Sequence, residues 1–177
     1  MKNKSMGVFV VFLLLAVMGL NLDCSDKKEE DQQTSDIWDI DANGIPRFVE
    51  TNYIELGKIG RISRFRSSVG HDYSDAFEHC RSMKHYFEPK ASADWASVRI
   101  YSPVNGTITR AEQEWAGTKL EIVSSNYPAF RFSVFHINLS TPRQVNDILM
   151  AGEFLGTHIG SQTTSDISVL VNDPGRQ

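Results

Sequence analysis

Five short stretches between residues 98 and 171 decide which kind of fold this chain can adopt. Each is rich in β-branched or aromatic residues, and Gly, Asn or Pro residues lie between them. The stretches are 98–101, 106–110, 119–123, 130–135 and 165–171. In the third and fourth, apolar and polar residues alternate, which is the pattern of a half-buried strand. Several short strands separated by turn residues predict a mainly β fold, either an antiparallel sheet sandwich or a small open barrel.

One helix is expected beside these strands. Residues 73–86 contain neither Gly nor Pro, and Pro89 would end a helix soon afterwards. Apolar residues between positions 76 and 87 recur at helical spacing and would form a buried stripe. They are Ala76, Phe77, Cys80, Met83 and Phe87. We therefore predict a helical insertion at about residues 76–89.

The first 24 residues have the layout of an export signal. Lys2 and Lys4 precede an apolar run over residues 6–22, and Cys24 follows it. The run is slightly shorter than the roughly 20 residues that a membrane-spanning helix needs. A cysteine in this position resembles the lipid-attachment cysteine of bacterial lipoproteins, although Asn21 and Asp23 differ from the usual residues there. A plain cleaved signal and an uncleaved anchor remain the alternatives.

The next segment, residues 25–36, reads as a solvated tether because residues 26–36 include no apolar side chain. The remaining length suits one domain. We expect residues 37–70 to form an N-terminal extension that packs on the core, and residues 71–177 to form the β domain. With only two cysteines, Cys24 and Cys80, the chain is not a disulfide framework.

Charge excludes one class of partner. Lys and Arg number 18 and Asp and Glu number 22, so the formal net charge is -4. Binding to nucleic acid needs a concentrated basic surface, which this balance does not favour. We therefore expect no nucleic-acid partner.

Four motifs follow one another in a recognisable order. His71 and Asp75 are four residues apart, and imidazole plus carboxylate is a normal zinc pair, although a surface histidine beside a helix-capping aspartate is the plain alternative. A turn at 102–108, His136 and the segment 145–156 come next. This order resembles the lysostaphin-type zinc endopeptidases, which cut peptide cross-links in bacterial cell walls. The resemblance covers about residues 71–171 and implies an open antiparallel sheet.

The same resemblance implies roles for single residues. His71 and Asp75 match two of the three zinc ligands of the family, and His136 matches a histidine that helps to activate the attacking water. The family closes with His-x-His on a strand, where this chain has Asp166 and Ser168. Asp166 therefore takes the catalytic position of that motif, and a serine hydroxyl is a poor substitute for a zinc-binding imidazole. The implied zinc site is incomplete.

Another residue could complete the ligand set. If a helix began at His71, then His71, Asp75 and His79 would recur every four residues on one face. Cys80, His85 and Asp166 are the other candidates. In the alternative interpretation, the histidines lie outside the buried stripe of a plain amphipathic helix and bind nothing. We expect His158 to be a loop histidine.

Three functions follow from these observations. The first is a membrane-anchored protein of the cell envelope that binds peptidoglycan peptide or an envelope protein without hydrolysis, because its zinc site is incomplete. The second is an active metallopeptidase with a rearranged zinc site. The third is a structural lipoprotein of unrelated β fold.

Overall fold

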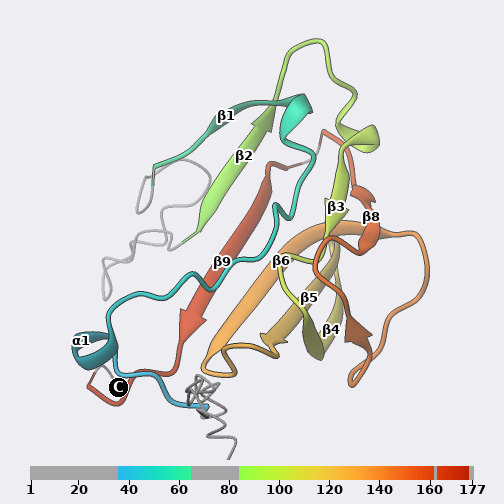
Figure 1. The fold of residues 1–177 in the computed structure, drawn as a ribbon. Helices are drawn as coiled ribbons and strands as arrows, with labels where there is room; N and C mark the ends of the chain where they lie inside the picture. The colour runs from blue at the N-terminus through green and yellow to red at the C-terminus, as the bar shows by residue number, and fades with distance from the viewer. Residues whose placement is uncertain (1–35, 65–83, 162, 176–177) are drawn as a thin grey trace, which may run out of the picture. The chain divides into compact units, whose positions relative to one another are not determined.

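The strands pair into one antiparallel sheet that does not close into a barrel. The computed structural model describes residues 36–64, 84–161 and 163–175, and nine strands form in this part of the chain (Figure 1). The strands are β1 (Ile59–Ile62), β2 (His85–Pro89), β3 (Arg99–Tyr101), β4 (Gly106–Glu114), β5 (Gly117–Ser124), β6 (Phe130–Leu139), β7 (Ile148–Leu149), β8 (Phe154–His158) and β9 (Ser165–Val171). Their order is β1-β2-β9-β6-β5-β4-β7, while β8 pairs with both β3 and β6. The predicted mainly β, antiparallel and open fold is confirmed.

The five predicted strands correspond to β3, β4, β5, β6 and β9. In β6, the sequence alternates although residues 132–137 are all buried. In β5, Leu120 and Ile122 are fully buried, whereas Lys119, Glu121 and Val123 are partly exposed. The period-2 pattern of β5 therefore reports one core face and one partly exposed face.

The predicted helix is wrong over its described part. Residues 85–89 form β2, which pairs with β1 on one side and β9 on the other. Tyr86 and Phe87 are consecutive and both buried. Because they lie on opposite faces of the strand, both faces of β2 are covered, and a strand buried on both faces lacks alternation. Residues 76–83 lie outside the described residues.

Helix is scarce in the described part of the chain. It comprises α1 (Ile40–Asn43) and two three-residue 3-10 turns, η1 (Leu56–Lys58) and η2 (Trp95–Ser97). The Asp39 carboxylate caps α1 by accepting from the Ala42 backbone N–H at 2.9 Å. No helix within the described ranges is both long and apolar enough to span a membrane.

Residues 36–58 lie against the sheet, and residues 59–62 join it as β1. Tyr53 and Ile54 are buried in the hydrophobic core, and Trp38, Phe48 and Ile59 pack against it from the outside. Phe48 stacks on Phe130 of β6 with ring centroids 4.8 Å apart. The predicted export signal at 1–24 and almost all of the tether at 25–36 lie outside the described residues.

The sheet branches at a bulge in β6. Thr118 of β5 pairs with Ile137 of β6, and Leu120 pairs with Val134. Between these pairs, one residue of β5 lies opposite two residues of β6, so β6 has one extra residue. His136 adopts a left-handed conformation there, with φ 61°. Beyond it, β6 pairs with β8. A bulge bends a strand and redirects its side chains, and this one lies at a candidate functional residue.

Candidate functional site

The structure brings two of the five predicted site residues together. His136 Nε2 of β6 lies 3.5 Å from Asp166 Oδ1 of β9. Both side chains are buried, with 6% and 1% of each residue exposed. His71, Asp75 and His79 lie outside the described residues, so the zinc ligand set stays a prediction.

Strand register explains why these two residues meet. Ile167 of β9 is opposite Val134 of β6, and Ile167 packs against the core. Asp166 comes next along β9, so it faces the other side of the sheet, level with Phe135. The bulge turns His136 toward that same side. Without the extra residue, the alternation of β6 would direct the imidazole into the core.

A hydrogen bond from Nδ1, the other ring nitrogen, fixes the orientation of the His136 ring. Nδ1 lies 2.9 Å from the carbonyl oxygen of Ala116, at the tip of the β4–β5 hairpin. A carbonyl only accepts hydrogen bonds, so Nδ1 carries the proton and donates it. Nε2 is then directed at Asp166.

A lysine completes the cluster. Lys84 Nζ lies 2.9 Å from Asp166 Oδ2 and 3.5 Å above the centroid of the Phe135 ring. The side chain of Lys84 is only 19% exposed. The ammonium therefore combines a largely buried ion pair with a cation–π contact. We call Lys84, Asp166 and His136 the charged cluster.

The described donors do not fit a zinc site. Within the described ranges, no three His, Cys, Asp or Glu side chains gather closely enough to hold a metal ion. Asp166 is bonded to an ammonium, which competes with any cation for the same carboxylate. Ser168, at the position of the expected third ligand, contributes only a hydroxyl. His85, another candidate ligand, has its Nδ1 3.1 Å from the Ser63 carbonyl oxygen.

His158 is not the loop histidine that the sequence predicts. It ends β8 and is 1% exposed. Its ring lies 5.1 Å from the Trp95 ring and 6.4 Å from the His136 ring, measured between centroids. The sequence of β8 does not predict this placement, because the neighbouring residues Leu155 and Gly156 are both buried and the strand therefore lacks a regular alternation. No local signal marks His158 as a core residue.

Burial makes the His158 imidazole hard to protonate. Desolvation is the largest cause and lowers its pKa to about 4; the Thr164 backbone raises the pKa, and the charge of His136 lowers it. Nδ1 accepts from the Gly160 backbone N–H at 3.2 Å.

The lowered pKa of His158 predicts that the folded state loses stability in acid. Above the unfolded-state pKa of about 6.5, His158 is neutral in both states; below it, the unfolded chain takes up the proton first. The free energy of unfolding should therefore fall by up to roughly 3 kcal/mol between about pH 6.5 and pH 4 on account of His158. Urea unfolding at a series of pH values measures it. The His158→Phe variant, which keeps a ring beside Trp95, should have a flatter profile, and an identical slope in both proteins would refute this assignment.

Comparisons with known proteins give one likeness. No family model matches the chain, and no curated protein matches it. Among solved structures, the chain is similar to the NMR solution structure of lysostaphin, with a TM-score of 0.37 and 16% sequence identity. The likeness covers 50% of this chain and 35% of that chain, so it spans about a third of the length of the lysostaphin structure.

Proposed function

We propose that this chain is an exported protein of the cell envelope whose lysostaphin-type domain binds peptidoglycan peptide or an envelope protein without hydrolysing it. The observation that carries this proposal is the position of Lys84. Its ammonium binds Asp166 at 2.9 Å, at the place where the family motif has a catalytic histidine. The export signal and tether of the sequence supply the envelope location and the membrane anchor.

The charged cluster argues against hydrolysis on chemical grounds. A zinc site needs neutral imidazoles or anionic groups around the ion. Among the described residues of this site, the anionic group is the Asp166 carboxylate, and the Lys84 ammonium already neutralises its charge. A carboxylate bonded to an ammonium is also a poor substitute for an imidazole that exchanges protons near neutral pH. The cluster instead has the character of a structural ion pair.

Purified wall fragments give the direct test. The protein without its predicted export signal should sediment with the fragments. It should release no new amino groups from them, with or without added zinc. A matched His136→Ala variant should leave this absence of hydrolysis unchanged. Amino groups released by the wild-type protein and not by His136→Ala would refute the proposal.

One observation favours a second candidate, the metallopeptidase with a rearranged site. Metal-binding and catalytic imidazoles are commonly oriented by a hydrogen bond from the second ring nitrogen to a backbone carbonyl. His136 has this arrangement, because Nδ1 donates to Ala116 and Nε2 is directed into the site. This candidate needs His71, Asp75 and a third ligand such as His79 to bind zinc. Hydrolysis that depends on both His71 and His136 would support it.

A further inference from the structure

A mainly apolar channel lies between the sheet and the segment 48–56. Its volume is about 350 Å³. The segment forms one wall, and residues of β2, β6 and β9 form the floor. The lining includes Phe48, Tyr53, Phe87, Phe132, Ile167 and Val169. We call it the apolar channel, and its volume lies within the range of about 300–1,000 Å³ that is usual for small-molecule sites.

Strand pairing gives the length of the channel floor. Phe132 of β6 is opposite Val169 of β9. Four residues back along β9, Phe87 of β2 is opposite Ser165. Two strand spacings of about 4.8 Å and four residues of about 3.3 Å separate Phe132 from Phe87, which gives a diagonal of roughly 16 Å. A volume of 350 Å³ spread along this diagonal is narrow, so it suits an unbranched chain better than a compact ring system.

The lining of the apolar channel carries no fixed charge. Among the described residues that form it, there is no Asp, Glu, Lys or Arg. Two of its polar side chains are engaged with protein atoms. The Tyr53 hydroxyl lies 3.3 Å from the Ser165 hydroxyl, and His85 Nδ1 lies 3.1 Å from a backbone carbonyl oxygen. A charged group in the channel would lose its hydration without a permanently charged partner.

The apolar surface of the channel continues to the outside of the protein. Val49, Leu56 and Val169 line the channel and are 39%, 43% and 36% exposed. Exposed apolar side chains around a hollow are typical of a ligand site. The channel is therefore accessible from solvent.

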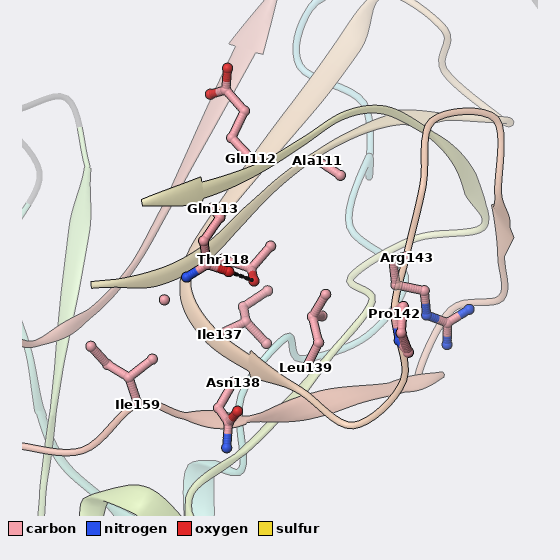
Figure 2. Close-up of a pocket in the computed structure, with 11 residues that line it drawn as sticks. Ala111, Glu112, Gln113, Thr118, Ile137, Asn138, Leu139, Pro142, Arg143 and Ile159 are labelled. Atoms are coloured by element: carbon pink, nitrogen blue, oxygen red, sulfur yellow. Dashed lines mark hydrogen bonds between the residues drawn. The ribbon is translucent and has the colours of Figure 1, made fainter. Parts of the chain in front are cut away.

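A larger hollow, of about 640 Å³, lies between the β4–β5 hairpin and β6 (Figure 2). Its lining mixes aliphatic side chains, such as Ile137 and Ile159, with polar ones, such as Glu112 and Asn138. No single ligand chemistry matches this mixture. The floor of the apolar channel, in contrast, presents mainly aromatic and aliphatic side chains.

We infer that the apolar channel binds one unbranched alkyl chain of an amphiphile, whose polar head stays in solvent at the mouth. Each methylene that leaves water for the channel favours binding. The narrow section takes one chain, so a single-chain amphiphile such as a fatty alcohol fits better than a bilayer lipid with two chains. The inference goes beyond the proposed function, because Ile167 of the floor and Asp166 of the charged cluster are neighbours on β9 and face opposite sides of the sheet.

A titration followed by NMR tests this inference. The probe is 1-decanol, added up to its solubility limit to the ¹⁵N-labelled protein without its predicted export signal. Backbone signals of Phe87 and Ile167 in the floor should shift saturably. 1-Adamantanol has the same number of carbon atoms in a compact cage and should bind at least about tenfold more weakly, because fewer of its carbon atoms reach the floor. Equal binding of the two alcohols would overturn the inference.

Vesicles of phosphatidylcholine distinguish the source of the chain. At the same concentration of alkyl chains, they should leave the signals of Phe87 and Ile167 in place. If the vesicles shift these signals and 1-decanol does not, the channel takes a bilayer lipid, and the inference is overturned.

Matched variants show whether the chain occupies the channel. Val169→Asp adds a carboxylate at the mouth and should weaken decanol binding by at least about tenfold, because this charge would lose hydration beside the chain. Leu170→Asp makes the same change at the next residue, which is 56% exposed and faces the other side of β9, and should leave binding unaltered. Val49→Asp introduces the charge from the opposite wall and takes the place of Val169→Asp if that variant does not fold. Unchanged affinity in both Val169→Asp and Val49→Asp would overturn the inference.

Discussion

Replacing Asp166 by alanine should lower the free energy of unfolding by about 3–5 kcal/mol, the usual cost of breaking a buried ion pair by removing one partner. Asp166 is 1% exposed and lies between Lys84, at 2.9 Å, and His136, at 3.5 Å. Without the carboxylate, a largely buried ammonium loses its ion-pair partner at this position. Chemical denaturation followed by circular dichroism measures the effect.

Two controls show whether burial causes this loss. Glu88→Ala removes the carboxylate that pairs with Arg61 on the neighbouring strand, where the side chains are 29% and 71% exposed, and should lower stability far less than Asp166→Ala. The double variant Lys84→Met with Asp166→Leu should recover most of the stability, because apolar replacement of a buried pair is often neutral. An Asp166→Ala loss no larger than that of Glu88→Ala would mean that the charged cluster is not formed.

Gly117→Ala should also be strongly destabilising. Gly117 has φ +86°, and a Cβ there would lie 2.3 Å from Ile159 Cγ2 and 3.0 Å from the carbonyl oxygen of Ile137. The left-handed backbone costs an alanine about 1–2 kcal/mol, and the overlap adds about 1–3 kcal/mol. We therefore expect a loss of about 2–5 kcal/mol in unfolding free energy. The overlap also presses on the segment that holds His136.

Gly152→Ala is the matched control for this prediction. Gly152 has φ +79°, and its nearest contact for a Cβ is Thr51 Cγ2 at an ordinary 3.9 Å. This variant carries the backbone strain alone and should lose only about 1–2 kcal/mol. The His136 ring signals in NMR spectra should move in Gly117→Ala and stay in place in Gly152→Ala. Equal stability losses and an unmoved ring would contradict the close approach of Gly117 to β6.

Sequence reasoning found the strands in which apolar and polar residues alternate. In β5, this alternation records a core face and a partly exposed face. β6 alternates in sequence as well, although its residues 132–137 are all buried, and the fold class could be read from both strands. In β2, the consecutive Tyr86 and Phe87 are both buried, and the segment was predicted as helix. Neighbouring strands on both sides determine β2, and a single sequence contains no trace of those neighbours.

The site was likewise predicted only in part from the sequence. His136 and Asp166 were singled out by the order of motifs, and the strand register places them together. Lys84 was not expected there, because an ion pair between residues 82 positions apart leaves no local pattern. The bulge at His136 was equally hidden, since histidine is only moderately favoured in a left-handed conformation. Contacts that depend on register and bulges are set by tertiary packing.

The zinc content of the purified mature protein tests the central claim most directly. After equilibration with zinc and removal of the free ion, atomic absorption should find far less than one zinc per chain, and the same amount in His71→Ala. The reason is that Lys84 already neutralises the carboxylate of the charged cluster. Zinc close to one equivalent per chain, lost in both His71→Ala and His136→Ala, would contradict a non-hydrolytic binding domain.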